Sequence, residues 1–198
     1  MVDPSVISED FDYVCFTDNL KLKSNIWEIR QIPEELKHLS NVKQQRCIKI
    51  CPHKYLKEYN DSIWLDANID IIEDIKTFID TQCNEKDKTI FIPQHPYRQC
   101  IYKEGDICIK IKKDRSEVIK QQMNKYLTEG FPENYGLNQT GIMYRKHNEL
   151  SCVEVMELWE SELSKHSHRD QLSFNYSLWK LNSNALQYLD KKLFNSKY

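Results

Sequence analysis

The segment Ser62–Ile71 constrains the fold more than any other part of the chain. It opens with the apolar run Ile63-Trp64-Leu65, typical of a buried strand of a parallel sheet, and stops abruptly at Asp66-Ala67-Asn68. Open α/β sheets bind ligands beyond the carboxyl ends of their strands. Because Asp66 and Asn68 are two residues apart, their side chains project to one side of an extended backbone. The pattern therefore predicts a strand that delivers oxygen ligands to a site.

Carboxylate and amide oxygens suit hard divalent cations such as Mg²⁺ or Mn²⁺, which keep water or phosphate oxygens in their remaining positions. Asp66 and Asn68 are thus candidate metal ligands, and Asp70 is a further candidate. A simpler interpretation stays open, in which Asp66 begins a turn and Asn68 caps the next helix.

Size and charge narrow the class of protein. A chain of 198 residues suits one domain, which we expect to span residues 1–198. The net charge of −2 gives no overall basic field, so we expect no nucleic-acid partner. With only four Gly, the chain has neither GxGxxG nor GxxxxGK[ST]. Any bound phosphate would have to be neutralised by a cation and basic side chains.

Cysteine usage and hydropathy indicate where the protein works. None of the seven Cys forms a CxxC pair, and no Cys/His set has zinc-finger spacing. Reduced thiols in a cytoplasmic protein are the simplest interpretation. The acidic N-terminal segment lacks the apolar core of a signal peptide, and no segment has the ~18 apolar residues of a membrane span.

Strands and helices alternate to about residue 92, which predicts an α/β domain with a mostly parallel central sheet flanked by helices. The pattern of residues 94–104 does not settle their secondary structure. From Asn182 we expect a charged helix. The expected strands are 11–16, 27–32, 62–65, 89–93 and a segment after Gly141. The expected helices are 41–50, one that starts at Pro52, 69–82, 114–127, 151–164 and one opened by the polar block 166–176.

Polar residues cluster where the expected strands end. Thr17-Asp18-Asn19 closes the first strand, either as an Asx turn or as the floor of a nucleotide pocket. His95, Arg98 and Glu104 follow the 89–93 strand, although a His before Pro can simply satisfy loop backbone.

Two further groups are separated from these strand ends. Arg46 and Lys49 share one face of a helix, and such a pair is typical of solvated surface charge as well as of a phosphate site. Arg169-Asp170-Gln171 lies in a polar block that exceeds what capping the following helix requires.

Several short pieces in order resemble a known family over about residues 11–180. Together they are similar to the glycosyltransferase-like domain of plant mucilage-type and bacterial proteins, and to the chlorella-virus capsid glycosyltransferase domain. The pieces are Tyr13-Val14-Cys15-Phe16-Thr17-Asp18-Asn19, Arg46 with Lys49-Ile50-Cys51-Pro52-His53, Ile63-Trp64-Leu65-Asp66-Ala67-Asn68, His95-Pro96-Tyr97-Arg98 with Ile101-Tyr102 and Glu104, Gly130-Phe131-Pro132 with Gly136-Leu137, and Arg169-Asp170-Gln171-Leu172-Ser173-Phe174.

The resemblance implies a GT-A-like fold, that is, a Rossmann-like nucleotide-sugar sheet with a DxD-type metal motif. It implies transfer of a sugar from a UDP-sugar donor, with Mn²⁺ or Mg²⁺ as cofactor, to a glycan, a glycoprotein or another hydroxyl acceptor. Asp66-Ala67-Asn68 takes the place of the DxD, with Asn in place of the second Asp. Asp70 would compensate for the lost charge.

The resemblance also implies roles for individual residues. Asp170 and Gln171 would be catalytic. Donor and nucleotide contacts would come from Thr17, Asp18, Asn19, Arg46, Lys49, Asp66 and Ala67, and acceptor or sugar contacts from His95, Arg98, Glu104, Gly141 and Arg169.

Two other functions remain open at this point. The Asn68 departure suits a non-catalytic module that binds a nucleotide sugar or a glycan. Carboxylates at strand ends are also typical of metal-dependent phosphohydrolases and nucleotidyltransferases.

Overall fold

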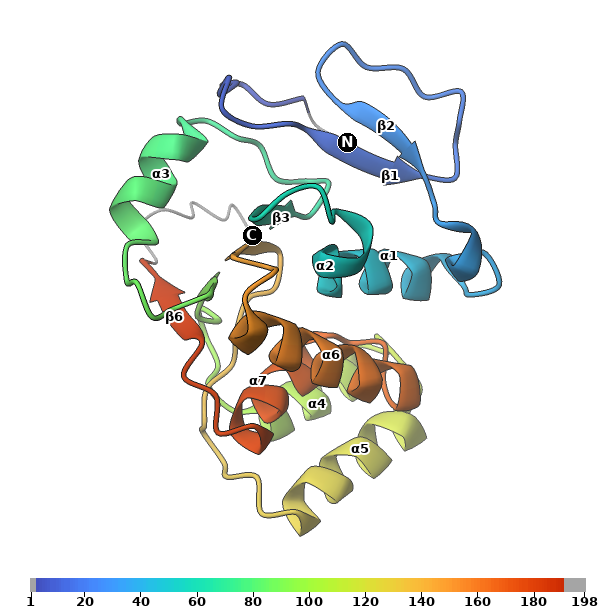
Figure 1. Ribbon diagram of the computed structural model, residues 1–198. Coiled ribbons are helices and arrows are strands. Elements are labelled where there is room, and N and C mark those ends of the chain that lie inside the picture. The colour runs from blue at the N-terminus through green and yellow to red at the C-terminus, as the bar shows by residue number, and fades with distance from the viewer. Residues whose placement is uncertain (1–2, 191–198) are drawn as a thin grey trace.

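The computed structural model describes residues 3–190, which form six strands, seven α-helices and one 3₁₀-helix (Figure 1). The strands are β1 (Val14–Thr17), β2 (Glu28–Gln31), β3 (Ser62–Leu65), β4 (Ile90–Pro93), β5 (Ile142–Arg145) and β6 (Leu186–Leu189). The helices are η1 (Glu34–Leu36), α1 (Asn41–Ile50), α2 (Pro52–Tyr55), α3 (Ile75–Gln82), α4 (Ile101–Lys110), α5 (Ser116–Thr128), α6 (Leu150–Lys165) and α7 (Gln171–Lys180).

The strands form two sheets. β1 and β2 make a parallel pair, shown at the top of Figure 1, in which Val14 lies opposite Glu28 and Thr17 opposite Gln31. The larger sheet has the order β3-β5-β4-β6. The alternation of strands and helices that predicted an α/β domain is therefore confirmed.

The prediction of a mostly parallel central sheet is wrong for the larger sheet. β4 and β6 are parallel, but β5 runs antiparallel to both β3 and β4. The cause lies in the loop before β5, which runs along the carboxyl ends of its neighbours. There Asp66 N donates to Gly141 O at 2.9 Å, and Gln139 N donates to Pro93 O at 2.9 Å. A strand that starts at that edge has to run back through the sheet.

Two expected helices differ from the structure, and the structure settles one segment that the sequence left ambiguous. The helix expected over 69–82 begins at Ile75, where Asp74 caps it by accepting from Thr77 N. The last residues of the ambiguous segment 94–104 form the start of α4, which begins at Ile101. The tail expected as a helix contains β6 instead, because it pairs with β4 along residues 186–189, and the part from residue 191 lies outside the described residues.

The main core forms where α6 and α7 pack beneath the sheet, in the lower half of Figure 1. Trp159 of α6 is fully buried, and its ring meets Phe174 of α7 edge-to-face at 4.8 Å. Met156 of the same helix is fully buried as well. α1 packs on α6 from the other side, so the core holds α1 in place against the sheet.

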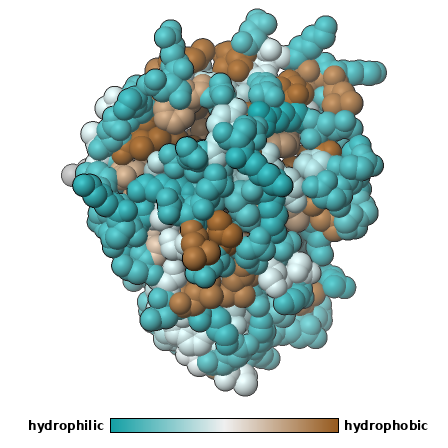
Figure 2. Space-filling model, viewed as in Figure 1, coloured by the Kyte–Doolittle hydropathy of each residue, from teal (hydrophilic) through white to brown (hydrophobic). Residues whose placement is uncertain are grey.

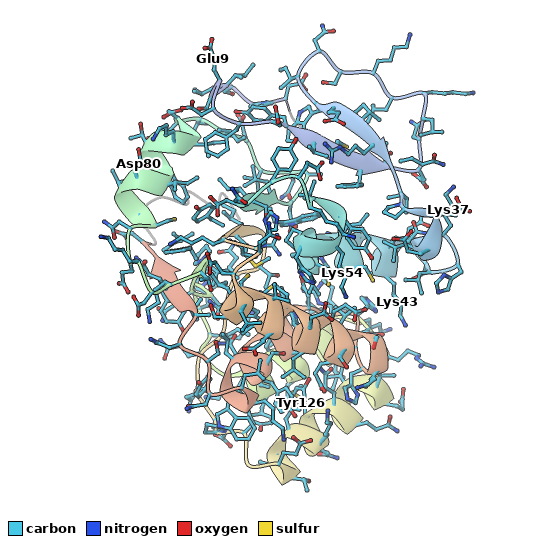
Figure 3. The ribbon with its side chains drawn as sticks, in the orientation of Figure 1. Glu9, Lys37, Lys43, Lys54, Asp80 and Tyr126 are labelled. Atoms are coloured by element: carbon cyan, nitrogen blue, oxygen red, sulfur yellow. The ribbon has the colours of Figure 1, made fainter. Side chains whose placement is uncertain are left out.

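The part of the surface that faces the viewer in Figures 2 and 3 is mainly polar. In Figure 3, Glu9, Lys37 and Asp80 project from the periphery, whereas Tyr126 lies among the lower helices. The face seen in Figure 2 is mostly hydrophilic, with separate apolar groups. None of the helices between residues 3 and 190 combines the length and the apolar character that crossing a membrane requires.

Candidate active site

Two cavities meet at the carboxyl ends of β1 and β3. The larger measures about 560 Å³ and is lined by β1, by residues of α1 from Asn41 to Ile48 and by the segment 64–69. The smaller measures about 330 Å³ and is lined by the segments 95–98, 139–141 and 169–171. Arg46 and Asp66 line both cavities and so form their common wall. One elongated ligand could therefore occupy both.

Asp66 is held at this wall by its neighbours. Its Oδ1 accepts a hydrogen bond from Trp64 Nε1 at 2.8 Å and lies 3.7 Å from Lys49 Nζ. Gly141 stands beside its other oxygen, since a Cβ added there would lie 3.3 Å from Asp66 Oδ2. The Asp66 side chain is nevertheless 41% exposed. A fixed carboxylate with solvent access is what a cation or ligand site needs.

Asp170 is buried at the entry to α7 and is surrounded by positive charge. Its Oδ2 lies 2.6 Å from Lys49 Nζ and 3.3 Å from Arg46 Nη1, and it accepts from Thr140 Oγ1 at 3.1 Å. Its Oδ1 accepts from Gln171 N at 3.0 Å, which caps the helix. The structure thus brings together Arg46, Lys49, Asp66 and Asp170 from three distant segments.

Burial and charge oppose each other in this cluster. Burial alone would raise the pKa of Asp170, but the attraction of Lys49 and Arg46 outweighs it and lowers that pKa to about 2. Burial lowers the pKa of Lys49 below its ordinary value, and Asp170 and Asp66 oppose that shift. Asp170 is therefore a permanent anion at neutral pH, and it balances two cations that face the smaller cavity.

The position of Lys49 depends on another buried cation, Arg145 of β5. Arg145 Nη1 donates to the carbonyl of Lys49 at 2.6 Å, at the last turn of α1. A cation at this end of a helix satisfies orphan carbonyls and matches the helix dipole. Burial lowers the pKa of Arg145 to about 10, so it remains charged at neutral pH. The β5 strand thus fixes the end of α1 that presents Lys49.

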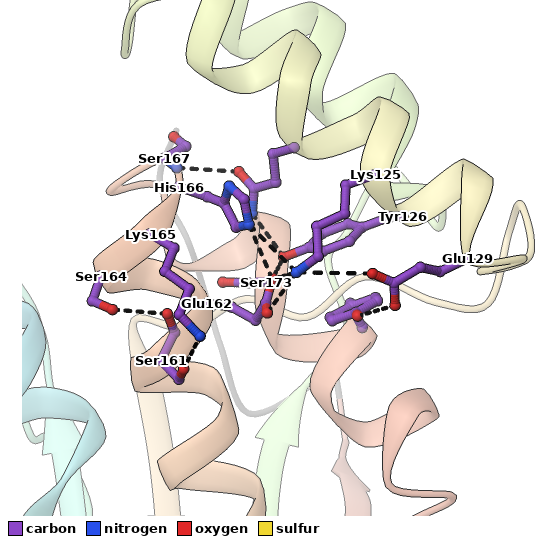
Figure 4. A network of polar contacts seen from close by, with 12 residues as sticks. Lys125, Tyr126, Glu129, Ser161, Glu162, Ser164, Lys165, His166, Ser167 and Ser173 are labelled. Atoms are coloured by element: carbon purple, nitrogen blue, oxygen red, sulfur yellow. Dashed lines mark hydrogen bonds and ion pairs between the residues drawn. The ribbon is translucent and has the colours of Figure 1, made fainter.

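The segment that delivers Arg169, Asp170 and Gln171 is anchored to the helices below it. Ser167 N donates to Gln122 Oε1 of α5 at 3.3 Å. Gln122 Nε2 donates to Tyr126 Oη, which in turn donates to Glu162 of α6. Figure 4 shows this network, in which Lys125 Nζ also donates to Glu162 at 2.7 Å. A chain of buried polar contacts therefore holds the loop before α7.

His95 and Arg98 line the smaller cavity, but Glu104 does not. His95 Nδ1 accepts hydrogen bonds from the backbone N of Tyr97 and of Arg98. His95 therefore also satisfies loop backbone, as the simpler interpretation of the sequence predicted. Burial and the nearby Arg98 charge lower the pKa of His95, which makes it neutral at pH 7. Glu104 is only 4% exposed and pairs with Arg98 Nε from behind. Glu104 therefore influences the cavity only by holding Arg98, which lines it.

The first-strand residues form a turn and also line a cavity. Thr17 Oγ1 accepts from Asn19 N, and Asn19 Oδ1 accepts from Lys21 N, as in the predicted turn. Thr17 and Asp18 line the larger cavity. Asn19 is not among its lining residues.

The remaining predicted residues divide between the cavities and the surface. Ala67 and Asn68 line the larger cavity, while Gly141, Arg169 and Gln171 line the smaller one. Asp70 instead accepts hydrogen bonds from Ser5 N and Ser5 Oγ, and it lines neither cavity.

Sequence reasoning missed several lining residues. Phe16, Trp27 and Trp64 supply aromatic surface to the larger cavity, and Tyr97 and Thr140 line the smaller. The apolar runs of β1 and β3 marked Phe16 and Trp64 as strand residues, although consecutive residues 14–18 and 64–69 all line this cavity. Thr140 carried no comparable signal, because its contact with Asp170 spans 30 positions.

The residues present suit a cation that shares its ligands with a substrate. Between residues 3 and 190, no group of three or more His, Cys, Asp or Glu side chains gathers in a metal-binding arrangement. Asp66 and Asn68 supply one carboxylate and one amide oxygen beside the same cavity. Mg²⁺ is commonly bound by one or two carboxylates together with substrate phosphates and water. The donor set fits this mode and would be completed by a phosphorylated ligand.

Comparison with known families agrees with this geometry. The family model described as TOD1/MUCI70, glycosyltransferase-like domain, matches residues 12–197. The chain belongs to this family. The match confirms the resemblance seen in the sequence and gives the protein, at the level of the family, a glycosyltransferase-type function. No curated protein and no solved structure matches the chain.

Proposed function

We propose that the protein is a metal-dependent glycosyltransferase that moves a sugar from a UDP-sugar to a hydroxyl group of a glycan or glycoprotein. The observation that carries the proposal is the pair of cavities with Arg46 and Asp66 in their common wall. A nucleotide sugar matches this arrangement of two cavities and a wall between them. It has a base and ribose at one end, a sugar at the other and a diphosphate in the middle.

The larger cavity suits the nucleoside. Its volume of about 560 Å³ falls in the range of small-molecule sites, and Phe16, Trp27 and Trp64 provide aromatic surface for a base. Thr17 and Asp18 would hydrogen-bond the base or ribose. Ala67 has only a methyl side chain, so it leaves the backbone of this wall open to the ribose.

Positive charge at the junction suits the diphosphate. Within the described residues, four cationic side chains line the smaller cavity, Arg46, Lys49, Arg98 and Arg169, against the two carboxylates of Asp66 and Asp170. This excess of positive charge takes the part that a Gly-rich loop plays in other nucleotide sites. A cation held by Asp66 and Asn68 would act as a Lewis acid toward the leaving diphosphate.

Transfer breaks the bond between the anomeric carbon and the diphosphate oxygen, whose electron pair leaves with UDP. A bond forms from that carbon to the acceptor hydroxyl oxygen, whose proton passes to the departing diphosphate or to water. Lys49 and Arg46 would stabilise the charge that develops on the diphosphate. Asp170 would keep both cations in place and, with Gln171, would form the wall beside the sugar.

Thermal unfolding with UDP, GDP and CMP, each with and without Mn²⁺, tests the proposal. We expect UDP with Mn²⁺ to raise the melting temperature most, because a ligand that binds only the folded state stabilises it. Equal shifts for all three nucleotides, or none, would count against a UDP donor.

A non-catalytic binding module is the second candidate, since both oxygens of Asp170 are already engaged by neighbouring groups. Slow release of free sugar from the UDP-sugar, measured without acceptor, separates the two functions. An enzyme releases sugar in a metal-dependent reaction, whereas a binding module leaves the donor intact.

A further inference from the structure

Tyr97 is unusually exposed for an aromatic residue beside a cavity. Its side chain is 77% accessible, the highest value among the large apolar side chains of residues 3–190. It also lines the smaller cavity, which places it at the rim. Its ring meets His95 edge-to-face with centroids 6.2 Å apart and contributes little to the core.

The loop that carries Tyr97 is nonetheless well anchored. His95 N donates to Leu137 O at 2.8 Å, and Gly136 N donates to Gln99 O at 3.0 Å, so both ends of the loop are tied to one segment. Inside the loop, Tyr97 N donates to His95 Nδ1 at 3.2 Å. Pro96 further restricts the backbone. The ring is therefore presented to solvent from a fixed position.

The surroundings of Tyr97 are polar and close to the reacting region. Arg98, Gln139 and Gln171 line the same cavity, and all three carry groups that can hydrogen-bond hydroxyls. A donor that enters through the larger cavity would reach the common wall from the other side. The rim at Tyr97 would then remain open to the second substrate.

We infer that Tyr97 is a stacking platform for a sugar ring of the acceptor, which makes the acceptor a glycan; this inference rests on the proposed function. The face of an aromatic ring is electron-rich and attracts the C–H groups on the apolar face of a sugar. Tyrosine gives this contact at low entropic cost because it has few rotatable bonds. The neighbouring polar side chains orient the hydroxyl that accepts the transferred sugar.

The test uses the full chain with Mn²⁺ and tagged UDP-sugars. The UDP-sugar that is hydrolysed fastest without acceptor is offered together with an array of defined oligosaccharides. The best-labelled glycan then serves for kinetics with the wild type, Tyr97→Ala and Tyr97→Phe. Ile72→Ala is the matched control, because Ile72 is 65% exposed and lines neither cavity.

We expect Tyr97→Ala to raise the KM for the glycan about tenfold, the order expected for the loss of one stacked ring. Tyr97→Phe should stay within about twofold of wild type, because the ring face is kept. Donor hydrolysis should be unchanged in all variants. An unchanged KM in Tyr97→Ala, or donor hydrolysis with no labelled glycan, would overturn the inference about Tyr97 and leave the proposed function intact. Failure to hydrolyse any UDP-sugar would overturn the proposed function and this inference with it.

Discussion

Replacing Asp170 with Asn tests the charge cluster most directly. The substitution keeps the shape of the side chain but removes the anion that balances Lys49 and Arg46, and Lys49 is only 1% exposed. Removing one partner of a buried ion pair costs about 3–5 kcal/mol, because the other charge stays buried and unpaired. For a chain of this size, we expect the melting temperature to fall by roughly 6–20 °C.

The pH dependence of this loss follows from the pKa of Asp170, which lies at about 2 instead of the ordinary 3.8. A carboxyl group whose pKa is lowered on folding contributes stability above its unfolded pKa and loses it as the pH falls through the folded value. That difference in pKa corresponds to about 2 kcal/mol. The free-energy gap between wild type and Asp170→Asn should therefore be constant above about pH 5 and narrow by about 2 kcal/mol toward pH 2.

Urea unfolding, followed by tryptophan fluorescence at several pH values, measures that gap. The control is the double variant Lys49→Met with Asp170→Asn, which removes both charges of the closest pair. Replacing both partners of a buried pair is often near neutral, so the double variant should be more stable than Asp170→Asn alone. If Asp170→Asn unfolds within about 1 kcal/mol of wild type at pH 7, or if the double variant recovers nothing, the assignment of a stabilising buried pair is wrong.

Three further substitutions address the site and its support. Asp66→Asn should abolish the Mn²⁺-dependent part of the UDP thermal shift while changing the free energy of unfolding by less than about 1 kcal/mol, because the side chain is partly exposed; a retained shift would contradict the metal assignment. Gly141→Ala should weaken metal-dependent sugar release without unfolding the protein, because its Cβ would lie 3.3 Å from Asp66 Oδ2; unchanged release would show that Asp66 yields freely. Arg145→Met should cost about 1–3 kcal/mol in urea unfolding, because the carbonyl of Lys49 loses a buried donor; a neutral result would show that this end of α1 is held by other contacts.

Local patterns predicted the parts of the fold that depend on neighbouring residues. The abrupt end of the apolar run at Asp66 correctly placed the end of β3. The apolar period of residues 151–164 correctly placed α6 with a buried Trp159. In both cases burial and solvent access alternate within a few residues, and this alternation is visible in a single sequence.

Features that depend on distant segments could not be predicted in this way. The direction of β5 is set by where the loop before it crosses the sheet, and a strand buried on both faces has the same composition in either direction. The Lys49–Asp170 pair joins residues that are 121 positions apart, and no local pattern records that contact. The ion pair of Glu104 with Arg98 likewise could not be predicted, because it depends on the position of α4.

The antiparallel β5 strand has a consequence for the width of the site. It lies between β3 and β4, so the ends of those two strands are separated by two strand spacings, roughly 10 Å. Asp66 follows β3 and His95 follows β4, and a sheet with these strands as direct neighbours would bring their ends to roughly half that separation. The inserted strand thus keeps Asp66 and His95 on separate walls of the smaller cavity, with residues 139–141 between them.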